Sequence, residues 1–236
     1  MGKERIIEVS NLSKIYITGE LPFKALKNID LYIKDGEFAV ILGPSGSGKS
    51  TLLNSLGGMD KPTTGKIIVR GNDISGYNNK LLTEYRKDEI GFVFQFYNLL
   101  SDLTVKENVE LAVEICSNPL DIDEILNNLG LGDKKNNFPS QLSGGEQQRV
   151  SIARAVAKNP TILLCDEPTG ALDYETGIKI LKVLTEINKK FKKTIIVITH
   201  NSSIGRIADR IIYLKSGEII DVIENNSPKS VDELEW

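Results

Sequence analysis

The alternation of apolar and polar residues divides the chain into segments of different kinds. Residues 4–37 alternate, as in Ile6–Val9 and Leu31–Ile33, and residues 65–71 repeat the pattern, which is typical of half-buried strands. We predict a small antiparallel sheet from these two segments. Continuous apolar runs, which indicate strands buried on both faces, alternate with helical periods across 38–59 and 160–220. These runs predict a mostly parallel sheet in an α/β domain.

Helical periodicity fills residues 97–157. Two helix starts, in which the first side chain caps the backbone, are indicated by Thr104 with Glu107 and by Asp121 with Glu124. Gly130 indicates a helix stop. We therefore expect a helical lobe inserted between the sheet-forming parts. Residues 225–236 are polar and acidic, so we expect a loosely docked tail that Trp236 could anchor.

A glycine-rich loop joins the predicted strand 38–42 to a helix that continues over 51–56. Residues 43–50 match G-x-x-x-x-G-K-S/T, the phosphate-binding loop. In such a loop backbone amides surround the phosphates, the lysine reaches the β- and γ-phosphates, and the final hydroxyl contacts Mg²⁺. The predicted nucleotide-binding residues are Gly43, Pro44, Ser45, Gly46, Ser47, Gly48, Lys49, Ser50 and Thr51.

A second anion site is predicted in the segment Leu142-Ser143-Gly144-Gly145-Glu146. Ser143 and Glu146 form a capping box, so a helix should begin at Ser143, and the two glycines leave its first amides accessible. Helix N-termini attract anions because unpaired amides and the helix dipole both face the ligand. An ordinary capped surface helix is the alternative interpretation.

Two adjacent carboxylates follow the apolar run 162–165. Asp166 and Glu167 stand at the carboxyl end of a predicted parallel strand, where ligands bind in open α/β sheets. We expect Asp166 to hold Mg²⁺ and Glu167 to orient or polarise an attacking water. In isolation the pair could be a solvated turn, but the two glycine motifs argue against that alternative.

Together these motifs resemble the ATP-binding-cassette (ABC) ATPase family over nearly the whole chain. Gln95 matches the Q-loop glutamine, which senses Mg²⁺ and the γ-phosphate, and His200 matches the switch histidine, which contacts the γ-phosphate. Asp173 matches the D-loop, Gln147 belongs to the signature segment, and Tyr16 matches the aromatic that stacks on adenine. A structural histidine at a strand end and a surface tyrosine are the alternatives for His200 and Tyr16.

The resemblance also implies an architecture and a mechanism. The fold would be a P-loop NTPase cassette of one domain, 1–224, with an antiparallel β lobe at about 4–37 and 60–90 and a helical lobe at about 97–157. Two copies would pack head to tail, with each ATP between residues 43–50 of one copy and 143–145 of the other. Hydrolysis of Mg-ATP would then loosen the dimer.

Composition limits the partners. The chain has 236 residues, is 40% hydrophobic and carries a net charge of −3, which suits one domain and argues against nucleic acid as the main partner. A single histidine excludes a histidine metal cluster, and two cysteines, Cys116 and Cys165, imply no disulfide framework. No stretch approaches a membrane span, and the start has no signal-peptide pattern. We expect a soluble chain whose membrane part is another polypeptide.

Residues 94–109 and 166–173 resemble the subgroup that serves macrolide-efflux, lipoprotein-release and antimicrobial-peptide-resistance systems. This implies an export motor on the cytoplasmic face of the membrane, coupled to a separate FtsX/MacB-type permease. Phe96, Tyr97, Leu99 and Leu100 would form an apolar patch for a permease helix, or else belong to the core of the lobe. A soluble ABC ATPase and a cell-division regulator that moves no substrate are the alternatives. Asn201 stands where family members often carry Asp.

Overall fold

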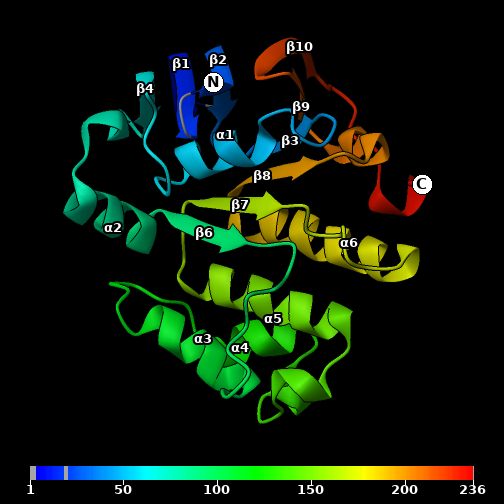
Figure 1. The fold of residues 1–236 in the computed structure, drawn as a ribbon. Coiled ribbons are helices and arrows are strands. Elements are labelled where there is room, and N and C mark those ends of the chain that lie inside the picture. The colour runs from blue at the N-terminus through cyan, green and yellow to red at the C-terminus, as the bar shows by residue number, and fades with distance from the viewer. Residues whose placement is uncertain (1–3, 19–20, 236) are drawn as a thin grey trace.

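The computed structural model describes residues 4–18 and 21–235. Two sheets and a group of helices are stacked in layers, with the helical lobe at the foot of Figure 1. The strands are β1 (Arg5–Thr18), β2 (Leu21–Lys34), β3 (Phe38–Leu42), β4 (Thr64–Val69), β5 (Asn72–Asp73), β6 (Ile90–Val93), β7 (Ile162–Asp166), β8 (Thr194–Thr199), β9 (Arg210–Lys215) and β10 (Glu218–Glu224). The α-helices are α1 (Lys49–Leu56), α2 (Asn79–Asp88), α3 (Val105–Val113), α4 (Ile122–Asn128), α5 (Gly144–Ala157) and α6 (Tyr174–Phe191).

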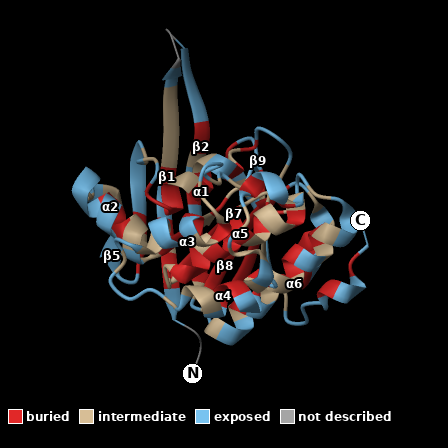
Figure 2. Cartoon of the chain, turned by 90° about the horizontal axis from the view of Figure 1, so that it is seen from below, coloured by how far each residue is buried: buried red, intermediate tan, exposed pale blue. Residues whose placement is uncertain are grey.

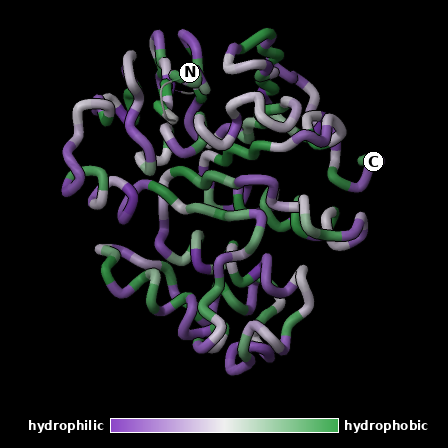
Figure 3. The backbone as a smooth tube through the Cα atoms, in the orientation of Figure 1, coloured by the Kyte–Doolittle hydropathy of each residue, from purple (hydrophilic) through white to green (hydrophobic). Residues whose placement is uncertain are grey.

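The central sheet has six strands in the order β10-β9-β3-β8-β7-β6. All neighbours from β9 to β6 are parallel, and β10 joins β9 as an antiparallel edge. Every residue of β3 and β8 is buried, because layers of structure cover both faces of the sheet. In Figure 3 these strands form a hydrophobic centre. The predicted apolar runs and the mostly parallel α/β sheet are thus confirmed.

The predicted antiparallel sheet is also present, with the strand order β2-β1-β4-β5. β1 and β2 each have 14 residues and pair from Arg5↔Lys34 to Thr18↔Leu21. Figure 2 shows this hairpin extending beyond the body of the molecule, with its far end exposed. The range 60–90 also contains α2, which begins where the Asn78 side chain accepts a hydrogen bond from the Leu81 amide.

Two hydrophobic cores lie on opposite faces of the central sheet. One is shared with α1 and the antiparallel sheet and includes Leu52, Leu53 and Leu56. The other is shared with the helices α3 to α6 and includes Val150 and Ile180. Buried residues in Figure 2 accordingly concentrate in the middle of the molecule. The central sheet, packed on both faces, therefore fixes the positions of the loops that follow its strands.

The helical lobe begins its helices at the predicted caps. Thr104 and Glu107 form a full capping box on α3, Asp121 caps α4, and Ser143 with Glu146 forms the box on α5. α5 packs against α3, α4, α6 and β6, so it joins the lobe to the central sheet. None of the helices in the described part of the chain combines the length and apolar composition that crossing a membrane requires.

The C-terminal tail is packed more firmly than its polar composition predicts. Val231 and Leu234 are buried in the core shared with the helices. The Tyr174 hydroxyl donates to the Leu234 carbonyl at 2.7 Å, and Lys182 of α6 pairs with Asp232. The expectation of a loosely docked tail is corrected, because two apolar side chains in this polar segment pack it against the core. The predicted anchor Trp236 lies outside the described residues.

A buried ion pair and the neighbouring carboxylate of Glu224 on β10 lie where the edge of the central sheet meets β2 of the hairpin. Arg210 is 2% exposed, and its Nε lies 3.0 Å from Oε1 of Glu37. Glu224 accepts hydrogen bonds from the Tyr32 hydroxyl at 2.8 Å, Lys34 Nζ at 3.1 Å and Arg210 Nη2 at 3.0 Å. These three donors, Tyr32 first, lower the pKa of the Glu224 carboxyl to about 2.

Candidate active site

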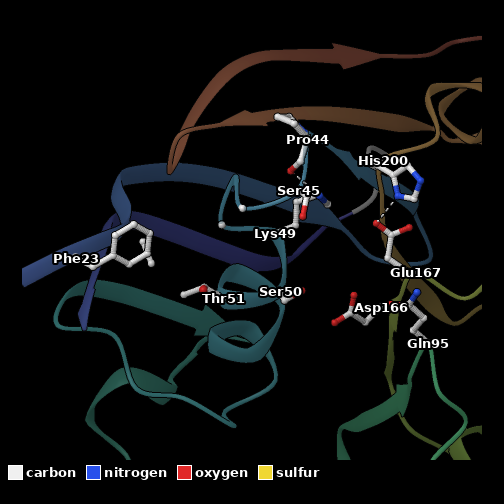
Figure 4. Close-up of a pocket in the computed structure, with 13 residues that line it drawn as sticks. Phe23, Pro44, Ser45, Lys49, Ser50, Thr51, Gln95, Asp166, Glu167 and His200 are labelled. Atoms are coloured by element: carbon white, nitrogen blue, oxygen red, sulfur yellow. Dashed lines mark hydrogen bonds and ion pairs between the residues drawn. The ribbon is translucent and has the colours of Figure 1, made fainter. Parts of the chain in front are cut away.

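A cavity of about 780 Å³ opens at the edge of the sheet where β3, β6, β7 and β8 end. Parallel strands end on the same side, so the loops that follow them converge there. Its walls come from β2, the phosphate loop, the start of α1 and the residues after β6, β7 and β8. Figure 4 shows its lining residues, which are Phe23, Ala25, Pro44, Ser45, Gly46, Gly48, Lys49, Ser50, Thr51, Gln95, Asp166, Glu167 and His200. Of the predicted residues 43–51, all but Gly43 and Ser47 line it.

The phosphate loop is shaped for an anion. Gly48 has φ +103°, and a Cβ there would lie 2.6 Å from the Ala25 carbonyl oxygen, so only glycine fits. Lys49 is 7% exposed, and its Nζ donates to the carbonyls of Gly43 at 2.7 Å and Pro44 at 3.0 Å. Both partners are neutral and an ammonium has three donors, so positive charge and one donor remain for a ligand. The loop therefore has the charge and the free donor that a phosphate requires, and phosphate binding stays a prediction.

Ser50, Asp166 and Gln95 bring oxygen donors to the same cavity. The Ser50 hydroxyl hydrogen-bonds to Asp166; burial raises the pKa of the Asp166 carboxyl, and this bond partly offsets the effect. A hydroxyl, a carboxylate and an amide oxygen are the hard ligands that Mg²⁺ takes together with substrate phosphates. Residues 4–18 and 21–235 contain no cluster of three or more His, Cys, Asp or Glu side chains suited to a metal. The donor set thus fits an ion that shares its coordination with a nucleotide.

The carboxylate of Glu167 is held on both oxygens. Its Oε2 accepts a hydrogen bond from the Thr199 hydroxyl at 3.0 Å, and its Oε1 lies 3.0 Å from Nδ1 of His200 (Figure 4). The Glu167 side chain is 14% exposed, whereas that of His200 is 67% exposed. The structure therefore brings the two predicted residues together at the cavity. It adds Thr199, which sequence reasoning missed because a threonine that ends an apolar strand forms no motif by itself.

The hairpin contributes a different aromatic residue to the cavity from the predicted one. Phe23 lines it, and Tyr16 is not among the lining residues. The two are direct cross-strand neighbours, but the Tyr16 hydroxyl donates to Asp60 and also hydrogen-bonds to Thr51. A contact between Tyr16 and adenine therefore stays a prediction. The pairing of Tyr16 with Phe23 is visible in the strand register of the structure and has no marker in the sequence.

The start of α5 lies outside this cavity. The Ser143 hydroxyl accepts from the Glu146 amide at 3.3 Å, and the Glu146 carboxylate accepts from the Ser143 amide at 2.8 Å. A Cβ on Gly145 would lie 2.3 Å from Cγ2 of Thr176, so α5 begins tightly packed on α6. Ser143 is exposed and Gly144 half-buried, and neither lines the cavity. Within one chain the two segments predicted to bind anions therefore do not share a cavity.

Three other predicted positions make local contacts. Gln147 Nε2 donates to the Leu142 carbonyl at 3.1 Å. Asp173 is exposed and caps α6 by accepting a hydrogen bond from the amide three residues later. The Asn201 side chain accepts from the Ser203 amide at 3.0 Å, the same capping bond that an aspartate would make. The departure from Asp at this position therefore leaves the loop after β8 capped.

Comparison with known proteins identifies the family. A model of the ABC transporter family matches residues 26–170. A putative ABC transporter ATP-binding protein of Mycoplasma pneumoniae is 45% identical over 237 residues, which cover 99% of this chain and 51% of that protein. The chain thus spans about half the length of this relative. The macrolide export ATP-binding/permease protein MacB of Campylobacter fetus is 46% identical over 227 residues, which cover 94% of this chain and 35% of that protein.

A solved structure shares the whole architecture. It is the dimeric post-hydrolysis state, bound to ADP and Pi, of the ATP-binding cassette MJ0796, a protein of Methanocaldococcus jannaschii. The TM-score is 0.84 at 44% sequence identity, and the match covers 92% of this chain and 98% of that chain. Because the family's sequence pattern, its fold and a complete phosphate and carboxylate site coincide, the chain belongs to the ABC transporter family and is an ATP-hydrolysing ATP-binding cassette of it.

Proposed function

We propose that this chain is the motor of a membrane exporter that couples ATP hydrolysis to a permease of the FtsX/MacB type. The permease would be a separate chain, and the motor would bind it at the cytoplasmic face of the membrane. The cargo class would be an antimicrobial peptide, a lipoprotein or a drug. The likeness to MacB over 94% of this chain supports this assignment, as do the subgroup motifs after Gln95.

The observation that carries the proposal is the division of the two anion sites. The cavity is lined by residues of the core and hairpin, and none of 143–147 lines it. Ser143 is exposed in one chain, so a phosphate bound by another copy can reach it. A twofold head-to-tail dimer supplies Ser143 and its neighbouring amides from the second copy. The dimeric MJ0796 cassette supports such an arrangement.

Each residue of the cavity then has its own role in ATP hydrolysis. Lys49 and the loop amides bind the β- and γ-phosphates, and Ser50, Asp166 and Gln95 hold Mg²⁺. When bound, Mg²⁺ neutralises phosphate charge. Glu167 orients a water molecule for in-line attack on the γ-phosphorus, and His200 turns to the γ-phosphate once the dimer closes.

The same geometry makes ATP the link that drives motion. The γ-phosphate lies between Lys49 of one copy and the start of α5 of the other, so its charge favours the closed dimer. Hydrolysis removes that bridge, and the closed state loses the interaction that distinguished it from the open one. Asp173, exposed beside the start of α6, would report the state of one site to the other.

Several apolar side chains of the helical lobe are exposed and suited to the permease. Phe96, which follows Gln95, is 74% exposed, and Leu100, Leu111 and Ile115 are exposed too. Leu100 is held against α3 because its amide donates to the Asn108 side chain at 2.8 Å. Leu99 instead packs on the core. The predicted docking segment is therefore part core and part surface, and the surface part supports binding of a short amphipathic permease helix.

The test is recovery of the partner with a trapped motor. Tagged Glu167→Gln, with Mg-ATP, is used to purify complexes from detergent-solubilised membranes of the source cell, and Ile115→Asp in the same background is the control. Recovery of one FtsX-type membrane protein in stoichiometric amount, reduced by Ile115→Asp, supports the proposal. Soluble partners alone would point to a soluble ABC ATPase. A permease that brings a cell-wall hydrolase would indicate the division regulator.

A further inference from the structure

We propose that Thr199 is a positioning residue that fixes one carboxylate oxygen of Glu167, so that the other oxygen is the one that receives the attacking water. The proposal rests on the proposed role of Glu167 in ATP hydrolysis. It assigns a function to a residue that lies behind the cavity wall and does not line it.

The hydrogen bonds of Thr199 set the direction of its hydroxyl proton. Its Oγ1 accepts from the Asn201 amide at 3.1 Å and lies 3.0 Å from Oε2 of Glu167. Because an amide can only donate and a carboxylate only accepts, the hydroxyl proton must point at Glu167. The Thr199 hydroxyl thus donates a charge-assisted hydrogen bond to one carboxylate oxygen, which is stronger than a hydrogen bond between neutral groups.

Thr199 is itself immobile. It is 1% exposed, it is the last residue of β8, and it pairs with Leu42 of the neighbouring parallel strand β3. A hydroxyl on a buried strand of the central sheet cannot follow movements of the loops around it. Its bond to Glu167 therefore persists while the cavity changes.

The backbone of Glu167 is equally constrained. Its φ is +44°, uncommon for a residue with a side chain, and its amide donates to the Ile198 carbonyl at 3.0 Å. Its own carbonyl accepts from the Gly170 amide at 3.0 Å. With the backbone pinned, the side-chain torsions are the remaining freedom of the carboxylate, and the Thr199 bond removes most of it.

The second oxygen of Glu167 has a partner that can leave. Oε1 lies 3.0 Å from Nδ1 of His200, whose side chain is 67% exposed at the cavity. Figure 4 shows the two side chains meeting at this edge, above Asp166 and Gln95. When His200 turns to a γ-phosphate, Oε1 becomes free to accept a hydrogen bond from water. The lasting bond from Thr199 thus positions the carboxylate through Oε2. The bond to His200 can break and leave Oε1 for the attacking water.

Thr199→Val tests this division, because valine keeps the shape of threonine and removes the hydroxyl. The freed carboxylate should spend much of its time turned away from the water, and misplacement of a catalytic group by about 1 Å costs on the order of 100-fold in rate. We expect kcat for ATP hydrolysis to fall about 10- to 100-fold. The KM for ATP should change less than about twofold, since the Thr199 hydroxyl hydrogen-bonds to Glu167 and the Asn201 amide and to no residue of the phosphate loop.

Three companion variants separate positioning from a merely structural effect. Thr199→Ser keeps the hydroxyl and should restore most of kcat, while Thr199→Ala repeats the loss should valine disturb folding. Thr194→Val is the matched control, because Thr194 lies at the other end of β8, is fully buried, and accepts from the Gly36 amide at 2.9 Å. Thermal unfolding of all four is measured beside the kinetics. Thr194→Val should lose similar stability and keep kcat.

The outcomes are distinct. A wild-type kcat in both Thr199→Val and Thr199→Ala, with Glu167→Gln inactive, overturns the role of Thr199 and leaves the proposed function standing. An equal fall in kcat for Thr194→Val, or no recovery with Thr199→Ser, also overturns it. Full hydrolysis by Glu167→Gln would remove the proposed function and this inference together.

Discussion

Replacing Lys49 by methionine should weaken ATP binding and leave the fold in place. Lys49 Nζ is buried and spends two of its three donors on the carbonyls of Gly43 and Pro44. The third donor and the charge are available to phosphate. A hydrogen bond to a charged group contributes about 1.5–3 kcal/mol, which corresponds to about a 10- to 150-fold rise in the Kd for ATP.

A second lysine, which is half-buried, provides the control. Lys158 Nζ donates to the carbonyls of Arg86 at 2.7 Å and Ile90 at 2.8 Å, the same chemistry as Lys49 but away from the cavity. Burial lowers the pKa of its ammonium group. Lys158→Met therefore removes an equivalent pair of bonds from a site that no nucleotide touches, and its Kd for ATP should match the wild type.

The assay is equilibrium titration with ATP by calorimetry, with thermal unfolding measured on the same samples. Both variants leave two carbonyls without a donor but also remove a charge that is at least half-buried, so we expect small and similar changes in stability. Binding of ATP by Lys49→Met within twofold of the wild type would contradict a phosphate contact of Lys49. Equal weakening of binding in Lys158→Met would contradict it too.

Three further changes address catalysis, pH and folding. Glu167→Gln should keep ATP affinity, lose at least about 100-fold in kcat and form an ATP-dependent dimer visible by light scattering; unchanged steady-state hydrolysis would contradict the role of Glu167. Glu224 has its pKa lowered from 4.5 to about 2, so its stabilising effect is present above its unfolded pKa and is lost as pH falls toward 2. Chemical denaturation across this acid range should show a smaller loss of stability in Glu224→Gln than in the wild type, and parallel losses would contradict the assignment. Thr104→Ala removes the cap of α3, which should cost about 1 kcal/mol and lower Tm by about 2–4 °C with an unchanged KM for ATP; a changed KM would mean that the lobe does more than fold.

Local patterns were sufficient where the chemistry comes from neighbours in sequence. The phosphate loop, the capping boxes at Thr104 and Ser143, and the carboxylates after β7 all appear in the structure as predicted. Each depends on backbone geometry that a few consecutive residues impose. Glycine at positive φ, a hydroxyl at a helix start and polar residues after an apolar run act over less than two helical turns.

Local patterns failed where strand register or distant packing decides. Phe23 lines the cavity because the β1–β2 pairing sets it directly opposite Tyr16, and the sequence contains no marker for that pairing. The tail docks because Val231 and Leu234 meet the core beside α6, a contact that its polar composition hides. In each case a few side chains outweigh the average character of their segment.

The sequence by itself determined the family, the fold class and the candidate residues for phosphate, magnesium and water, because these follow from short motifs with their own backbone geometry. Only the tertiary structure decided which of those residues share one cavity. It places Lys49, Asp166 and Glu167 together and leaves Ser143 on another surface. It also sets Thr199 behind Glu167, 32 positions away along the chain and 3.0 Å away in space. The order of strands in the central sheet, which no local pattern encodes, creates both results.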